Sequence, residues 1–251
     1  SSLIHYESLR EDEDNDTQPT IVGDARYERR LFPPRLGGEL RFGAEIHGHY
    51  RYSSRALDGP DADTIVDGRD VARINAEISW RDRWTLAGGL RAGLASHLWL
   101  DHFATTQDAF AEDRASQATL GTAVELRWPF QRRGPQGGRS LIEPVVQLGW
   151  VSGERLGNAN DESTRVEFDE GNLLALSRFP APDRRERGAT LAAGLRFLHE
   201  APAGWSAAFT LGSVWREDAE AAFSRSSGLG GTQSDLLVAG RIHRLAGDQL
   251  R

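Results

Sequence analysis

The sequence contains no cysteine, no methionine and no lysine among its 251 residues. Without cysteine, the chain has no disulfide framework, no thiol nucleophile and no thiolate ligand for a metal ion. Without lysine, arginine occupies all 30 positions counted as lysine or arginine, a bias that a GC-rich genome also produces. No run of apolar residues approaches the length of a transmembrane helix, so the sequence excludes a helical membrane protein.

Two further absences concern targeting and partners. The chain opens SSLIHYES, with neither a start residue nor a signal peptide, and we therefore expect a mature product or an excised piece of a longer protein. No basic stripe outweighs the acidic background, and the net charge is -7. This balance argues against a nucleic-acid partner.

The sequence does contain many segments that alternate between polar and apolar residues, which is typical of β-strands with one face on each environment. Residues 38–53 are the clearest example. The polar face of this segment is a candidate lumen face and carries Glu39, Arg41, Glu45, His47, His49 and Arg51. Further strands are predicted within residues 71–81, 84–100, 120–130, 142–150, 191–197, 205–211 and 236–242, with weaker signals near 3–9 and 21–31. The polar break Arg81-Asp82-Arg83 predicts a tight hairpin.

Short and long connections alternate along the chain, and aromatic residues cluster near the ends of the apolar faces. Long polar connections are predicted within residues 11–20, 55–70, 105–117, 153–171 and 217–233. This asymmetry is typical of outer-membrane barrels, which have short periplasmic turns and long external loops. We therefore predict an all-β fold, an antiparallel transmembrane β-barrel of meander topology. A soluble antiparallel β-sandwich that acts as a binding module is the alternative, because its strands alternate equally well.

Motifs for catalysis or cofactor binding are not found. His47 and His49 share a strand face with Glu45, but a wetted polar interior explains them better than a metal site. The acids around Glu170 could bind calcium or transfer protons, yet solvated loop charge is the commoner explanation. The glycine-rich SSGLGGTQS near Ser226 lacks the lysine of a phosphate-binding loop and is interpreted as a mobile loop. We expect no enzymatic activity, no cofactor and no metal.

Residues 161–188 form the most distinctive segment, with charged ends and a compact apolar centre. Such a segment predicts an ordered loop that folds back onto a scaffold. Its characteristic elements are Phe168-Asp169, Asn172-Leu173, Arg178-Phe179 and Asp183-Arg184. In this order and spacing the segment resembles the outer-membrane LPS-assembly proteins, the LptD or organic-solvent-tolerance family.

The resemblance implies a function. Members of this family move lipopolysaccharide into the outer leaflet of the Gram-negative outer membrane, without making or breaking a bond. They work with a plug lipoprotein, LptE, and with periplasmic proteins that bridge lipopolysaccharide to the barrel, and they contact outer-membrane lipid. The family barrel has more strands than this sequence predicts, and the periplasmic amino-terminal domain is not visible. We therefore expect residues 1–251 to be part of a larger barrel, with a small complete porin-like barrel as the alternative.

The arginine-rich run from Asp183 to Gly188 allows two interpretations. Its arginines could bind the phosphates of lipid A. They could instead pair with nearby acids and hold the loop in place, and we favour this structural role.

Overall fold

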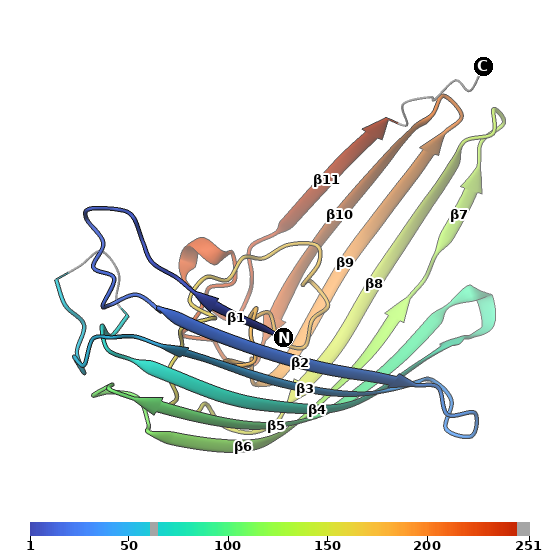
Figure 1. Cartoon of the computed structure of the whole chain (residues 1–251). Coiled ribbons are helices and arrows are strands. Elements are labelled where there is room, and N and C mark those ends of the chain that lie inside the picture. Colours follow the sequence, from blue (N-terminus) through green and yellow to red (C-terminus); the bar gives the residue numbers. More distant parts are fainter. Residues whose placement is uncertain (61–64, 245–251) are drawn as a thin grey trace.

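The alternating segments pair into one antiparallel sheet of 11 strands (Figure 1). The computed structural model describes residues 1–60 and 65–244. Its strands are β1 (Ser2–His5), β2 (Ile21–Leu31), β3 (Glu39–Tyr50), β4 (Asp70–Thr85), β5 (Arg91–Thr106), β6 (Arg114–Arg127), β7 (Phe130–Arg133), β8 (Arg139–Val151), β9 (Gly188–Ala201), β10 (Trp205–Arg216) and β11 (Leu237–Arg244). Within the described residues, no helical segment has the length and hydrophobicity needed to traverse a bilayer.

The strand order follows the chain order, as a meander requires, except that β7 pairs only with β8. In the described part of the chain β1 and β11 are the two edges, and the sheet is open. The prediction of an all-β antiparallel meander is confirmed. Two sheets packed face to face, as in the sandwich alternative, are not what these residues form.

The predicted hairpin at Arg81-Asp82-Arg83 is wrong. Strand β4 continues through Thr85, and the chain turns instead at residues 86–90, which include a short 3-10 segment. Gly88 and Gly89 supply this turn, because both adopt a positive φ that glycine tolerates best. Arg81 and Arg83 are two apart and share one face, so the alternation persists through this polar stretch.

Short and long connections do alternate, as predicted. The short ones span residues 32–38, 86–90, 134–138 and 202–204 and lie at one end of the sheet. The long ones span 6–20, 51–69, 152–187 and 217–236 and lie at the other end. Only 107–113 is shorter than expected there, because β5 and β6 extend into the predicted connection.

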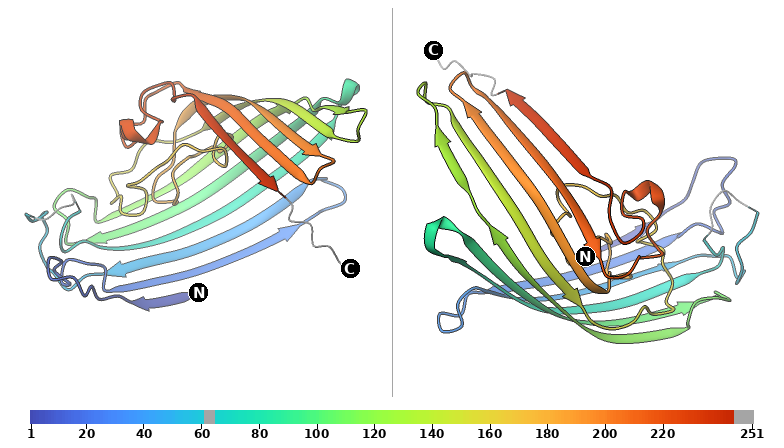
Figure 2. Two further views of the ribbon diagram at one scale, coloured as in Figure 1. Left: turned by 90° about the horizontal axis from the view of Figure 1, so that it is seen from above. Right: turned by 180° about the vertical axis from the view of Figure 1, so that it is seen from behind.

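The sheet curves into a trough, and residues 152–187 lie within its concavity (Figures 1 and 2). Its two faces differ sharply in chemistry. On β4, Arg73 is 2% exposed whereas the adjacent Ile74 is 51% exposed. The same inversion recurs on other strands, so the concave face is rich in charge and the convex face presents large apolar side chains to the surroundings. Examples of the latter are Ile46, Ile78, Leu100, Leu120, Val124, Leu148 and Trp150.

The junction between β6 and β8 is the least regular part of the sheet. Only residues 121–127 pair with 145–151 there, whereas β5 pairs with β6 over residues 91–104. Near this junction lie Pro129, which separates β6 from β7, and Pro144 of β8, neither of which can donate a ladder hydrogen bond. The sheet bends at this point, and the two arms of the trough diverge (Figure 1).

Candidate functional site

Residues 152–187 connect β8 to β9 and cross the concave face; we call them the strap. The strap contains all eight residues of the family-like motif: Phe168, Asp169, Asn172, Leu173, Arg178, Phe179, Asp183 and Arg184. It has almost no regular secondary structure, so its conformation depends on side-chain contacts with the sheet.

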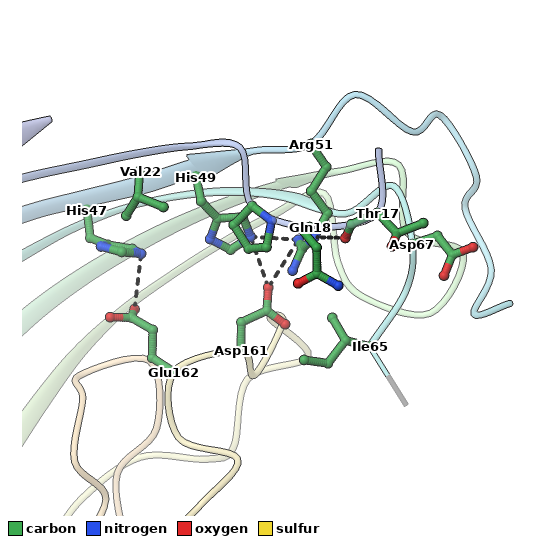
Figure 3. A pocket seen from close by; sticks show the side chains of 11 residues that line it. Thr17, Gln18, Val22, His47, His49, Arg51, Ile65, Asp67, Asp161 and Glu162 are labelled. Atoms are coloured by element: carbon green, nitrogen blue, oxygen red, sulfur yellow. Dashed lines mark hydrogen bonds and ion pairs between the residues drawn. The ribbon is translucent and has the colours of Figure 1, made fainter. Parts of the chain in front are cut away.

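The amino-terminal part of the strap is held by charges on β3 and β4. Figure 3 shows the contacts with β3, where Glu162 faces His47 and Asp161 faces His49. Glu162 receives a bidentate pair of hydrogen bonds from Arg73, whose Nη2 lies 2.7 Å from Glu162 Oε1. Asp161 lies 3.1 Å from His49 Nε2 and forms an ion pair with Arg69. A cavity of about 340 Å³ opens beside these groups, between the strap and the ends of β2 and β3.

The electrostatics of Asp161 follow from these partners. Burial alone would raise the pKa of its carboxyl, but the hydrogen bond from His49 and the charge of Arg69 outweigh burial and lower the pKa. Arg69 also donates to Asp108 of the 107–113 connection at 2.6 Å. A single guanidinium therefore joins the strap to a neighbouring loop.

At the centre of the strap, leucine side chains pack directly on glycine residues of the sheet; we call this contact the leucine seat. Leu173 is 1% exposed and covers Gly194 on β9 and Gly212 on β10, which face each other across the ladder. A Cβ added at Gly212 would come within 2.6 Å of Leu173. Leu176 covers Gly149 of β8 in the same way, with a corresponding distance of 2.8 Å.

Just before Leu173 the strap makes a turn, in which the side chains of Asp169 and Asn172 each bind backbone groups of the other residue. The Asp169 carboxylate accepts from the backbone N–H groups of Gly171 and Asn172 at 2.8 and 2.9 Å. The Asn172 side chain in turn accepts from the Asp169 N–H and donates to the Glu167 carbonyl. The Asp-x-x-Asn spacing thus encodes the turn that presents Leu173 to the sheet.

A fully buried ion cluster fixes the carboxyl-terminal half of the strap. Glu186 is 1% exposed and accepts from Arg178 Nη1 at 2.9 Å and from Arg216 Nε of β10 at 2.7 Å. Arg178 also donates to the Leu173 carbonyl. Burial lowers the pKa of Arg178, and the negative charge of Glu186 works against that shift. The cluster couples the leucine seat to the sheet.

Phe179 belongs to a second apolar cluster that consists entirely of loop residues. Its ring centroid lies 4.6 Å from that of Phe223, and Val166 and Leu229 complete the buried set. Phe223 and Leu229 come from the connection between β10 and β11. Leu229 is fully buried, so the prediction of a mobile loop at SSGLGGTQS is wrong: this loop packs against the strap.

Asp183 and Arg184 close the strap on itself. Asp183 accepts from the N–H groups of Glu162 and Ser163 and from the Ser163 hydroxyl, and burial is the main cause that raises the pKa of its carboxyl. Arg184 donates to the side chain and backbone of Asn158 at 2.7 and 2.8 Å.

The other arginines of this run also bind within the molecule. Arg185 donates to Asp101 of β5 and lies over the Trp99 ring. Arg187 donates to neutral oxygens of Gln117, Thr119 and Ser152. Only Arg185 therefore forms an ion pair with an acid as the sequence analysis expected, but all three arginines tie the strap to itself or to the sheet.

A groove of about 900 Å³ runs between the strap and the concave face of β2 to β6. Its floor includes Arg41 and Glu45 of the candidate lumen face, while Glu39 pairs with Arg81 nearer the short turns. His47, His49 and Arg51 lie instead under the strap, along the smaller cavity. The structure thus places the six candidate residues on one face but divides them between two environments.

Sequence reasoning missed the groups that hold the strap, namely Glu186, Arg216, Asp161, Glu162 and Arg73. The one available signal is Glu186, the acid that lies between arginines in the DRRERG run. Among the described residues, no group of three or more histidines and acids is placed to hold a metal ion.

Comparison with known proteins agrees with this architecture. No curated protein sequence matches the chain. The profile of one family, described as "LptD: LPS transport system D", matches residues 1–245 and so covers nearly the whole chain. The chain belongs to the LptD family of lipopolysaccharide transport proteins.

Proposed function

We propose that this chain forms part of the wall of an outer-membrane barrel through which lipopolysaccharide reaches the outer leaflet of a Gram-negative cell. The transfer makes and breaks no covalent bond. Residues 1–251 contribute a partial barrel, with the concave face toward the lumen and the long connections toward the cell exterior.

The observation that supports this proposal is the inversion of the two faces. A soluble protein buries apolar side chains and exposes charge, whereas here Arg73 is 2% exposed and Ile74 is 51% exposed. Exposed apolar side chains on a convex sheet suit contact with lipid, and a charged concave face suits a water-filled lumen. An amphiphile can keep its sugar head on the second surface while its acyl chains follow apolar surface.

The groove under the strap is the space available to the sugar head. The strap is fixed to the sheet by buried ion pairs and by Leu173, so it narrows the lumen as part of the wall. The path then runs between the strap and β2 to β6.

An open sheet also bears on the choice between a larger barrel and a small porin-like one. Unpaired strand edges are not tolerated in lipid, so β1 and β11 must pair with further strands or with each other. We favour further strands. Cysteines introduced at Ile4 and Val238 would form a disulfide in detergent if the chain closes on itself, and the larger-barrel proposal would then fail.

The partners follow from family membership and are part of the proposal. A plug lipoprotein of the LptE type would occupy lumen that the strap leaves free, and a periplasmic bridge would deliver lipopolysaccharide at the short-turn end.

The direct test is site-specific photocross-linking in living cells. A photoreactive residue at Ala123, which lines the groove, is expected to yield lipopolysaccharide adducts. The matched control is Leu126, on the opposite face of the same strand and near the short turns. Adducts at Leu126 but not at Ala123, or none at either position, would contradict the proposed path.

A further inference from the structure

We propose that the short-turn end of the concave face holds an anion-binding site built around Arg196, which takes a phosphate group of the transported glycolipid. This inference rests on the proposed function and adds a recognition site for one chemical group. The site occupies a second cavity of about 340 Å³ that continues the groove. Four arginines from three strands line it: Arg81, Arg83, Arg127 and Arg196. Arg83 follows Arg81 on β4, and the others lie on β6 and β9.

Arg196 is the critical residue because no carboxylate of the described residues lies within ion-pair distance of its guanidinium. It is half-buried on β9, opposite Glu143 of β8 in the register. Glu143 lies 3.4 Å from Arg127 instead. Within the described part of the chain, the side chain of Arg196 forms no hydrogen bond and no ion pair; it acts at longer range on the Glu125 carboxylate, which already binds Arg127. A half-buried guanidinium without a partner carries a desolvation cost that an anionic ligand would offset.

The neighbouring charges leave room for an anion. Glu125 is occupied by Arg127, whose Nε and Nη2 donate to its two oxygens at 2.6 and 2.8 Å. Arg83 is largely exposed and lies 3.8 Å from the same carboxylate, too far for a strong hydrogen bond. Two further acids line the cavity: Asp82 accepts from the Arg83 N–H, and Glu170 extends from the strap. Arg196, together with Arg83 and its long ion pair to Glu125, therefore provides the positive charge that an anion can bind.

The geometry of the arginine guanidinium groups indicates which class of ligand the site binds. Guanidinium groups bind phosphate oxygens through two parallel N–H bonds, a geometry that a single ammonium cannot offer. A phosphate ester or diphosphate of a glycolipid headgroup presents several such oxygens. At this end of the groove, such a site would meet the headgroup as it enters the lumen and before it passes beneath the strap.

The test is equilibrium binding to the full chain in detergent, with three probes: phosphorylated lipopolysaccharide, the same lipopolysaccharide after dephosphorylation, and inorganic diphosphate. Arg196→Gln is expected to weaken binding of the phosphorylated glycolipid and of diphosphate by roughly tenfold or more, because a charge-assisted contact is lost. Binding of the dephosphorylated glycolipid should not change. Arg139→Gln is the matched control, since Arg139 lies on the same face of β8, outside the cavity. It should bind like the unmodified protein.

Each outcome decides the question. Equal binding by Arg196→Gln and the unmodified protein would overturn the site, as would an equal loss for the dephosphorylated probe. A third outcome is that Arg196→Gln loses diphosphate binding while neither protein binds any glycolipid. This outcome would support the anion site, but it would overturn the glycolipid as the source of the phosphate and, with it, the proposed transport. If Arg196→Gln fails to fold, Arg83→Gln removes an exposed charge from the same cavity and should weaken phosphate binding several-fold.

Discussion

At the scale of single residues, the strap depends on glycines that leave space for leucines. Gly194 and Gly212 sit side by side on β9 and β10 beneath Leu173, and any Cβ there would overlap its methyl groups. Such close packing leaves little freedom to adjust, since interiors are packed as densely as organic crystals. The position of Leu173 is therefore specified by two residues that lack side chains.

We predict that Gly212→Ala destabilises the protein by about 1–3 kcal/mol, the usual cost of overpacking. The measurement is urea unfolding in detergent, combined with proteolysis of the strap. Gly93→Ala is the control, because the nearest side-chain atom would lie at an ordinary 3.5 Å. In a Leu173→Ala background Gly212→Ala should cost less, because only the Ala193 carbonyl, at 3.2 Å, then crowds the new Cβ; an undiminished cost there would refute the leucine seat.

A second prediction concerns the buried ion cluster. Glu186→Gln leaves Arg178 and Arg216 buried without a compensating charge, and we expect a loss of about 3–5 kcal/mol. Glu170→Gln, at an exposed position of the same strap, should change stability little. The same unfolding measurement applies, and comparable values for the two variants would show that Glu186 does not hold the cluster together.

At the scale of elements, the strap is predictable as a unit but not in its contacts. The order of Phe168, Asp169, Asn172 and Leu173 identifies an ordered loop, and the Asp169–Asn172 caps are local in sequence. The anchoring pairs are not local: Arg69 and Asp161 are 92 positions apart. No periodicity encodes such a pair, because its formation depends on how the sheet brings β3, β4 and the strap together. Loop charges that look solvated in the sequence thus become buried partners.

The two ends of this strap respond to acid in opposite directions. The pKa of Asp161 lies below its ordinary value of 3.8, so its ion pairs contribute fully above that pH and are lost as the pH falls through the lowered value. The pKa of Asp183 is raised, so protonation favours its buried state, and its contribution declines as the pH rises through the raised value.

We therefore predict that acidification below pH 3.8 loosens residues 158–163. Hydrogen-exchange protection factors, which correct for the intrinsic exchange rate, are the measurement. Asp161→Asn should show weaker protection at neutral pH and little further change on acidification. The idea fails if this variant keeps the acid dependence of the unmodified protein.

At the scale of the whole molecule, the strand pattern was the most predictable property. The period of two over residues 38–53 predicts the strand that the structure gives as β3, and it assigns Glu39, Arg41 and Glu45 to one face. The predicted turn at Arg81 and Arg83 is wrong because both residues belong to the charged face of a continuing strand, and a polar stretch on such a face resembles a turn in the sequence. The curvature that turns that face inward is a property of the assembled sheet.

The inversion of the faces leads to a prediction about lipid. Ile78→Arg, at the middle of the convex face of β4, should reduce stability in phospholipid vesicles by about 2–4 kcal/mol. Ala95→Arg places the same charge in the groove and should cost much less. Folding titrations in vesicles compare the two variants, each introduced into the barrel with all its strands so that β1 and β11 are paired. Equal effects would mean that the convex face does not contact lipid.

The short β6–β8 junction has a consequence for the order of synthesis. The strap contacts Arg73 on one side of this junction and Arg216 on the other, and Arg216 follows the strap in the chain. Its docking therefore cannot be completed until β10 has been made and paired. We therefore expect residues 152–187 to be more accessible to proteases in a chain whose β10 is not yet paired than in the folded protein.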